Sequence, residues 1–428
     1  MNNEEVKKLH EPLFHIEKRG GVSKKKAWGI RGIGILVAVV IVSILAAIML
    51  QADPFTFFGK MFEGAFGTTN RIWNMLRDTA ILLGFALAIV PAFRMRFWNL
   101  GANGQVLMGA FAFTVCMFYL YGKIPLGVLV PLMVISSVAA GMLWAAIPAV
   151  FKAFFNTNES LFTLMMNYIA ESLVTFTITV WVPNGSGSLP PIIPGGLKLF
   201  DNAYILPILI IALLTVGMFF YLRISKQGYE LTVVGESENT ARYIGINVKK
   251  VIIRTLAISG AICGLVGFLL SGCMSGTINP QIHSGYGFTA IIVTWLAQFN
   301  PLVMAGVAFL VIFVNRGMKS GIKPAFGLTT EAFANIVTGI IFFCVLAFEF
   351  FIVYKFKYRS DVEEKMNAFK AKFKKKSAAK VATEATSDGV VASESASEAA
   401  EKANGAGDAE NGENAAEKAT EEVNKEEE

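Results

Sequence analysis

The chain has 428 residues and a net charge of +6, and 54% of its residues are hydrophobic while only 16% are charged. A typical soluble domain carries about 25% charged residues, so a soluble core of this size would expose too much apolar surface to water. The basic residues adjoin apolar runs and do not alternate with aromatic residues, which excludes a nucleic-acid-binding protein. The four cysteines are isolated and lack CxxC spacing, so we expect no zinc site, no disulfide framework and no cofactor.

The N-terminal segment, residues 1–31, is strongly basic and precedes a first apolar run at 33–50. Lysine and arginine beside a first span favour a cytoplasmic N-terminus. The run has about 18 residues, more than the roughly 7–15 apolar residues of a secretory signal, so we expect an uncleaved transmembrane helix. Residues 53–78 are then expected to form an outside loop with a short amphipathic helix.

Two stretches interrupt the apolar segments in corresponding halves of the chain, NLGANGQ at 99–105 and SGYGF at 284–288. Backbone that leaves helix geometry at membrane depth must be buried in protein or line a cavity. The aromatic residues beside these stretches are Trp98, Tyr286, Phe288 and Trp295. The pattern favours either a solute site in which these rings stack on a ribose or base, or short loops with interfacial aromatic anchors.

A polar stripe runs along the predicted span at 160–182. Thr163, Asn167, Glu171 and Thr175 recur every four residues and therefore share one helix face. A carboxylate inside a span costs about 2.5–3.5 kcal/mol on insertion scales, and it usually faces a cavity or a partner. The stripe indicates either a pathway that meets ligand hydroxyls or base edges, or hydrogen bonding between helices. A polar loop rich in proline and glycine follows at 183–202.

The longest charged stretch between spans, residues 223–254, is placed in the cytoplasm by its lysine and arginine content. Within it, Ser237 or Asn239 can cap a short helix that ends near Gly245. Apolar side chains such as that of Tyr243 lie in this charged setting. Such a helix suits docking into a groove of a partner, and it equally suits an interfacial position on lipid headgroups.

The apolar runs together predict an all-α, polytopic membrane protein of about ten transmembrane helices, with two related halves that contain broken helices. The spans are expected at about 33–50, 79–97, 105–121, 125–150, 160–182, 203–222, 255–275, 286–299, 301–316 and 332–354, within a transmembrane domain at 32–355. An even number of spans places both termini in the cytoplasm. Arg316, Lys319 and Lys323 then fall on an outside loop, unless 286–316 enters and leaves on one side as a broken hairpin.

Residues 356–428 are basic as far as Lys376 and acidic afterwards, and no aromatic residue occurs from 377 onward. A segment of this composition cannot bury enough apolar area to offset the entropy lost on ordering. We expect a disordered cytoplasmic tail, which is either inert or used for regulatory binding.

Sequence signatures of catalysis are missing. No GxxxxGK[ST] sequence occurs, so the chain cannot bind ATP through a P-loop. His10 and His15 lie in the N-terminal segment and His283 stands alone, so neither a nucleophile–base pair nor a metal-ligand cluster is indicated. We therefore expect no catalytic or metal-binding residue, and a protein that is not an enzyme.

Four stretches resemble, in order, the permease family of ATP-binding-cassette (ABC) importers for ribose-like sugars, branched-chain amino acids and nucleosides, and the nucleoside and simple-sugar branch most closely. They are FWNLGANGQVLMGAF (97–111), TLMMNYIA (163–170), GYELTVVGESENTARYIGINVKKVII (228–253) and SGYGFTAIIVTWLAQFNP (284–301). The resemblance covers about residues 30–355. It departs from the family at Asn103, where the family commonly has glutamate, and this puts a specific role for that position in doubt.

The resemblance implies a permease domain that moves nucleosides or simple sugars across the plasma membrane. It also implies a separate cytoplasmic ABC ATPase, a second permease chain of the same or different sequence, and an extracytoplasmic substrate-binding lipoprotein. In the family, the segment matching 228–250 is the coupling helix that contacts the ATPase. The matching residues here are Gly235, Glu236, Asn239, Ala241, Arg242, Tyr243, Gly245 and Ile246.

The candidate substrate path is predicted from the polar and aromatic residues at the two breaks and on the stripe. It comprises Trp98, Asn99, Asn103, Gln105, Asn167, Glu171, Tyr286, Phe288 and Trp295. Two other functions compete with the permease. One is a secondary transporter of a small polar solute driven by an ion gradient, for which only Glu171 and Glu349 offer intramembrane carboxylates. The other is a membrane scaffold that acts through its tail.

Overall fold

The computed structural model describes residues 14–19, 23–182, 187, 189–190, 202–327 and 332–358. The chain divides into two compact units, one formed by residues 22–352 and the other by 1–21 together with 353–428. Most of the loop predicted at 183–202, and all of the tail beyond residue 358, lie outside the described residues. The expectations for those segments stay predictions.

The unit of residues 22–352 is built from helices. Its first half contains α2 (Lys24–Leu50), α3 (Pro54–Phe66), α4 (Thr69–Arg94), α5 (Ala102–Leu120), α6 (Leu126–Phe155), α7 (Glu159–Trp181) and α8 (Ile205–Ile224). Its second half contains α9 (Lys226–Glu236), α10 (Glu238–Tyr243), α11 (Val248–Phe268), α12 (Tyr286–Leu296), α13 (Pro301–Gly317), α14 (Lys323–Ala325) and α15 (Ala332–Val353). Two π-helical stretches, η1 (Leu269–Ser275) and η2 (Met318–Ile322), continue α11 and α13.

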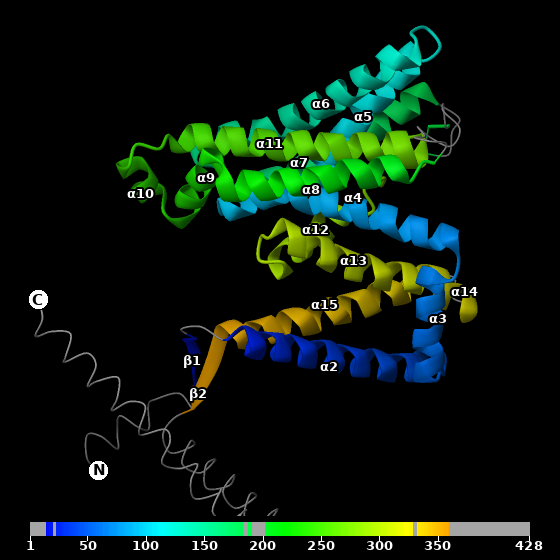
Figure 1. Cartoon of the computed structure of the whole chain (residues 1–428). Coiled ribbons are helices and arrows are strands. Elements are labelled where there is room, and N and C mark those ends of the chain that lie inside the picture. Colours follow the sequence, from blue (N-terminus) through cyan, green and yellow to red (C-terminus); the bar gives the residue numbers. More distant parts are fainter. Residues whose placement is uncertain are drawn as a thin grey trace, which may run out of the picture. The chain divides into compact units, whose positions relative to one another are not determined.

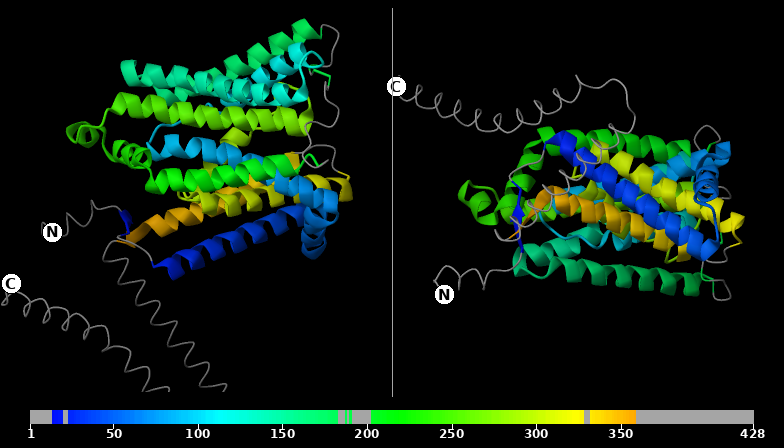
Figure 2. Two further views of the ribbon diagram at one scale, coloured as in Figure 1. Left: turned by 45° about the horizontal axis from the view of Figure 1, so that its top comes forward. Right: turned by 90° about the horizontal axis from the view of Figure 1, so that it is seen from below.

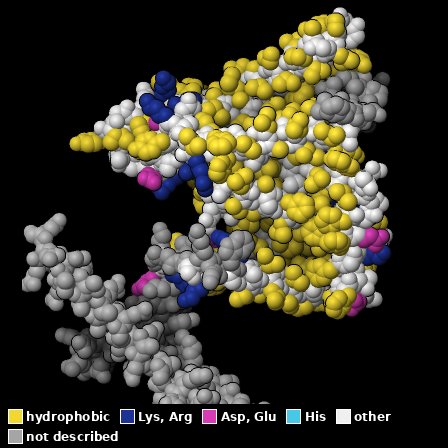
Figure 3. All heavy atoms as spheres, in the orientation of Figure 1, with side chains coloured by type: hydrophobic (Ala, Val, Ile, Leu, Met, Phe, Trp, Pro, Cys, Tyr) yellow, Lys and Arg dark blue, Asp and Glu magenta, His cyan; other side chains and the backbone are white. Residues whose placement is uncertain are grey.

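Nine helical segments of the described chain are long and apolar enough to cross a membrane. They run alongside one another (Figure 1, Figure 2), and hydrophobic side chains cover the face drawn in Figure 3 between two ends where charged side chains gather. Helix α12 is a further apolar helix of 11 residues, which spans about 16 Å or roughly half of a bilayer core. The all-α polytopic fold with about ten transmembrane helices is confirmed.

The start of α2 and the end of α15 lie at the same end of this unit. Arg31 of α2 donates from Nε and Nη2 to the Glu349 carboxylate of α15, at 3.0 and 2.9 Å. Helices α9 and α10 project from this same end (Figure 1). The chain therefore crosses the apolar slab an even number of times, which requires α12 and the segment before it to supply the tenth crossing.

Helix α13 is a full span. With η2 and α14 it forms one helical run of 25 residues, Pro301–Ala325, that is long and apolar enough to cross a membrane, which favours ten spans over a hairpin at 286–316. The π-helix η2 packs against α3 at the end opposite α10 (Figure 1), so Arg316 lies where ten spans place it. Its charge is neutralised there, because Arg316 forms an ion pair with Asp78 of α4, a buried carboxylate that Arg77 also contacts.

The predicted outside loop at 53–78 is too long. The short amphipathic helix within it is confirmed as α3, which Asp53 caps by accepting from Phe55 N–H at 3.1 Å and which buries Phe57 and Met61. However, α4 begins already at Thr69 and not near 79. The polar residues of its first turns misled the hydropathy argument, although all of residues 69–77 except Met75 stay exposed or half-buried. The carboxylate of Asp78 is buried, and its ion pair with Arg316 stabilises it there.

The core lies around α4 and α11. Residues Ala80–Phe93 of α4 are all buried, as expected for a helix that is hydrophobic on every side. Helix α11 packs closely on α6 and α5 through glycines. A Cβ on Gly260 would collide with Gly141 of α6, one on Gly264 with Ser137, and one on Gly267 with Val106 of α5. Small residues let these backbones approach one another within the apolar slab.

The second unit contains a two-stranded antiparallel ribbon. Strand β1 (Phe14–Lys18) pairs with β2 (Tyr354–Tyr358), with Phe14 opposite Tyr358, Ile16 opposite Phe356 and Glu17 opposite Lys355. The sequence analysis missed this ribbon, although residues 14–17 and 354–358 alternate apolar and polar residues with the period of two that is typical of strands. It ignored the signal because each run has only five residues and lies beside a much longer hydrophobic span.

Candidate functional site

The predicted helix in the charged segment is present as α10, directly after α9. Ser237 caps it by accepting a hydrogen bond from Thr240 N–H at 3.2 Å, and the chain leaves it through Gly245 at a φ of 85°. Positive φ is the conformation for which glycine is favoured after a helix. Both features were predicted. The helix pair forms the tip that extends beyond the spans in Figure 1 and carries much of the charge seen at that end in Figure 3.

The predicted coupling residues divide into an outer and an inner set. The outer set is exposed and consists of Glu236, Asn239, Arg242, Tyr243 and Gly245. Tyr243 is 93% exposed. The inner set, Gly235, Ala241 and Ile246, faces the bundle and holds the helix pair in place. Only the outer set is available for contact with a partner.

Helix α9 packs very closely on the ends of two spans. At its first turn, a Cβ on Gly228 would collide with the carbonyl oxygen of Tyr221 in α8. At its last turn, a Cβ on Gly235 would collide with the carbonyl oxygen of Arg94 and would lie 3.1 Å from Met95 Cα. Glu230 also receives a hydrogen bond from Arg254 Nη2 of α11 at 3.0 Å. The helix therefore cannot move without its neighbours.

The first break, residues 99–105, is held by buried amides. Asn99 accepts from Gly101 N–H at 3.0 Å, exchanges hydrogen bonds with Gln105 at 3.1 and 3.3 Å, and donates to Ser259 Oγ of α11 at 3.2 Å. Asn99, Gln105 and Ser259 are all buried. These side chains satisfy one another and the backbone of the break, as buried polar groups must.

Helix α7 supplies the other supports of the first break. Asn167 accepts from Gly104 N–H at 2.8 Å and donates to the Leu100 carbonyl at 2.9 Å. Thr163 Oγ1 accepts from Leu100 N–H at 3.1 Å. Two members of the predicted polar stripe therefore hydrogen-bond to a neighbouring segment, which is the interhelical alternative. Thr175, in contrast, bonds only to the Glu171 carbonyl of its own helix among the described contacts, and its side chain is exposed.

The two breaks meet. Gly287 N–H at the start of α12 donates to Asn103 Oδ1 at the start of α5, at 2.8 Å, and both residues are buried. A Cβ on Gly287 would collide with that oxygen, so the close approach requires glycine. The sequence placed these stretches in corresponding halves, 184 residues apart, and the structure brings them into direct contact.

The lone histidine has a partner. His283 Nδ1 accepts from Gly285 N–H at 3.1 Å, so its Nε2 is left to donate to Glu171 Oε1, 3.3 Å away. His283 is buried, whereas 26% of the Glu171 side chain is exposed. The sequence analysis missed His283 as a site residue. Its only signal was its place beside the second break, because pairing with a residue 112 positions away leaves no local trace.

The predicted aromatic residues lie in two places. Trp98 and Trp295 stack with ring centroids 5.8 Å apart, each about half exposed. They line a cleft of about 440 Å³ together with Arg94, Arg96 and Glu236. Tyr286 packs edge to face with Phe85 at 6.2 Å, away from that cleft, and Phe288 is 47% exposed.

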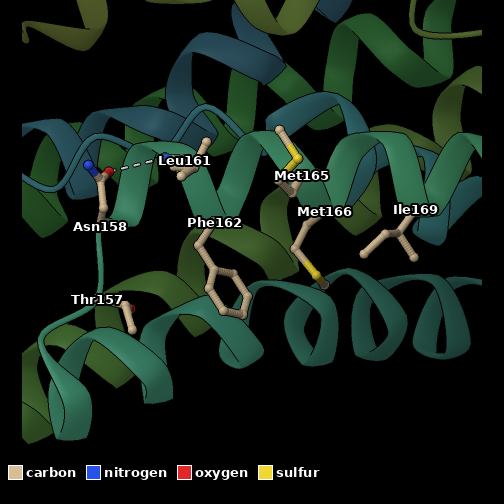
Figure 4. Close-up of a pocket in the computed structure, with 7 residues that line it drawn as sticks. All are labelled: Thr157, Asn158, Leu161, Phe162, Met165, Met166 and Ile169. Carbon is tan, nitrogen blue, oxygen red and sulfur yellow. Dashed lines mark hydrogen bonds between the residues drawn. The ribbon is translucent and has the colours of Figure 1, made fainter.

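A separate apolar groove of about 340 Å³ lies along the first half of α7 (Figure 4). Its lining residues are Thr157, Asn158, Leu161, Phe162, Met165, Met166 and Ile169. In Figure 4 only Asn158 among the labelled side chains shows a hydrogen bond, to Leu161 N–H at 3.1 Å, where it caps the helix. A lining so poor in polar groups suits a lipid chain or a partner helix and does not suit a polar solute.

Comparison with known proteins places these features in context. Residues 71–346 match the family model described as the branched-chain amino acid transport system permease component. The glucose ABC transporter permease protein TsgB13 of Haloferax volcanii is 27% identical over 80% of this chain and 93% of its own length. The guanosine ABC transporter permease protein NupP of Bacillus subtilis is 30% identical over 56% of this chain and 71% of its own. The nucleoside ABC transporter permease protein NupB of Lactococcus lactis is 26% identical over 73% of this chain and 90% of its own.

Proposed function

Because the chain belongs to the permease component family of branched-chain amino acid transport systems, and is thus a multi-pass ABC importer permease, we propose that it carries nucleosides or simple sugars across the cytoplasmic membrane. The solute class rests on the relatives, whose names specify glucose, guanosine and nucleosides. In this proposal the chain binds the solute weakly, and an extracytoplasmic binding lipoprotein supplies selectivity.

The helix pair α9–α10 is the proposed docking site of a separate cytoplasmic ATPase, and its exposure is the observation that carries this proposal. Tyr243 and Arg242 project from α10, which Ser237 caps and which directly follows α9, whose glycines contact the ends of two spans. A rigid helix with an exposed ring suits insertion into a protein groove. This assignment makes the end with α9, α10 and the start of α2 cytoplasmic, so that both chain termini are cytoplasmic and the binding lipoprotein approaches the end with α3.

The solute pathway is proposed to pass the junction of the two breaks, where Glu171 and Thr175 are exposed on α7 and Phe288 on α12. Asn99, Asn103, Gln105 and Asn167 hold the walls of this pathway, because their polar atoms are already bonded to the breaks. A second permease chain, identical or different, completes the pathway on the open side of α7.

The acidic residues of the described spans disfavour an ion-coupled transporter. Asp78 pairs with Arg77 and Arg316, Glu159 with Lys152, Glu171 with His283, and Glu349 with Arg31. An ion path needs acidic groups that exchange their partners for the ion during transport. Carboxylates that already have basic partners fit a permease driven from outside the membrane better.

Reconstitution tests the proposal. Proteoliposomes that contain the chain, its ATPase and its delivery protein should accumulate labelled nucleoside or sugar only when ATP is present on the ATPase side. Accumulation driven by a proton or sodium gradient with no ATPase present would support the ion-coupled alternative and reject the permease. Deletion of residues 377–428 separates the permease from a scaffold, because a transporter should keep uptake without the tail whereas a scaffold should lose its function.

A further inference from the structure

The contact between α9 and the first break suggests how a docked ATPase acts on the membrane interior. The last turn of α9 lies against Arg94 and Met95, where α4 ends and the non-helical connector to α5, residues 95–101, begins. Gly235 approaches the backbone of Arg94 and Met95 so closely that no side chain fits between them. The connector and the end of α9 also share two clefts, of about 440 and 230 Å³, both lined by Arg96, Gly235 and Glu236. Contact at Gly235 is thus backbone to backbone, with open space on either side.

The second residue of the connector, Arg96, has an unfavourable backbone conformation. Arg96 N–H donates to the Phe93 carbonyl at 2.9 Å and Phe97 N–H to the Ala92 carbonyl at 2.9 Å, the two bonds of a Schellman motif. Arg96 is the residue of that motif that takes the left-handed conformation, with a φ of 60°. Glycine normally occupies this place, and non-glycine residues in this region persist where the surroundings impose it. Backbone strain is therefore stored at Arg96, directly after the two residues that α9 contacts.

The far end of the connector reaches both breaks. Asn99 is bonded to Ser259 of α11 and to Gln105 of α5, and Trp98 stacks on Trp295 of α12. Asn103, just beyond the connector, accepts from Gly287 at the second break. Displacement of residues 95–98 must consequently disturb the stack, the amide network or both.

We propose that the connector 95–101 transmits ATPase-driven movement of α9 to the two breaks, with Gly235 and Arg96 as positioning residues. The inference rests on the proposed function, because it assumes that an ATPase docks on α9–α10. Gly235 lets α9 press directly on the connector backbone. Arg96 holds the start of the connector in a strained backbone conformation, so that a small movement of α9 changes the conformation of the connector.

Gly235→Ala tests the contact, with Gly64→Ala of α3 as a control outside the docking helices. Both added methyl groups would collide with backbone atoms, one at Arg94 beside the connector and one at Gly321 of η2. In the reconstituted complex, Gly235→Ala should raise the ATP hydrolysed per solute imported by at least about fivefold, the low end of ordinary coupling energies. Gly64→Ala should leave that ratio within about twofold of the unmodified chain, because it touches neither α9 nor the connector.

Arg96→Gly keeps the test decisive if Gly235→Ala does not fold. Glycine adopts a φ of 60° without strain, so this variant should be at least as stable as the parent. It should nevertheless require several times more ATP per solute, because the connector backbone is then free to take other conformations. Asn156→Gly is its control, since Asn156 has a φ of 50° at the end of α6, where it belongs to neither α9 nor the connector.

The outcomes separate the two proposals. If the unmodified chain shows no ATP-driven uptake, the permease assignment fails and the connector is irrelevant. If the unmodified chain couples normally and Gly235→Ala and Arg96→Gly match their controls, the connector inference is overturned while the permease assignment stands.

Discussion

The two breaks satisfy the same requirement in different ways. The first is held by side chains from three helices, with Asn167 and Thr163 from α7, Gln105 from α5 and Ser259 from α11. The second is a local turn in which Ser284 and Gly285 both have positive φ. Its contacts with other helices include the bond of Gly287 to Asn103, the packing of Tyr286 on Phe85 and, from the adjacent His283, the bond to Glu171. The conformation of the first break therefore depends on a network of side chains from several helices, and that of the second depends more on its own backbone turn.

The largest effect on stability is expected for Asn167→Ala at the first break. This change leaves the Gly104 N–H and the Leu100 carbonyl without their partner, and each buried orphan costs about 1–3 kcal/mol. The apparent Tm in detergent should fall sharply, or the protein should not fold. Thr175→Ala on the same helix removes only a bond to its own helix and should change little. A normal Tm for Asn167→Ala would show that water replaces the amide.

Gly287→Ala, at the second break, should destabilise less. The added methyl overlaps Asn103 Oδ1, and such overpacking costs about 1–3 kcal/mol unless the turn yields. Adding Asn103→Ala should recover part of the loss, because it removes the overlapping atom. Thermal unfolding of both single variants and the double variant measures this coupling, and strictly additive losses would contradict direct contact between the breaks.

His283→Ala should affect stability by about 1 kcal/mol and uptake more strongly, because Glu171 loses the donor that orients it. His283→Gln, which keeps a donor, should retain most uptake. Initial rates at saturating and limiting solute distinguish positioning from general damage. An unchanged rate for His283→Ala would remove this pair from the pathway.

Tyr243→Ala should change the free energy of unfolding by less than about 0.5 kcal/mol, because the ring is almost wholly exposed. Binding of the ATPase should nevertheless weaken about tenfold or more, as for other aromatic anchors at interfaces. Tyr229→Ala, which removes another exposed ring from α9, serves as the control. Equal loss for both would indicate a lipid-facing role.

Sequence reasoning predicted what hydrophobicity and local caps determine. Apolar runs located the spans, and Ser237 and Gly245 fixed α10 to within a few residues. It failed where stability depends on pairs distant in the chain. Asp78 and Arg316 are 238 positions apart, and the polar start of α4 is intelligible only once they are paired. The pair of Glu171 with His283 is also distant in the chain. The strained turn at Arg96 was also missed, because a positive φ at a residue other than glycine leaves no pattern in nearby residues.

The glycine contacts of α11 restrict which parts of the bundle can move. The backbone of α11 lies directly against those of α6 and α5 at successive turns, at Gly260, Gly264 and Gly267. Sliding or rolling any of these helices past its neighbour would first require the backbones to separate within the bilayer. We therefore expect α5, α6 and α11 to stay together as one rigid group during transport.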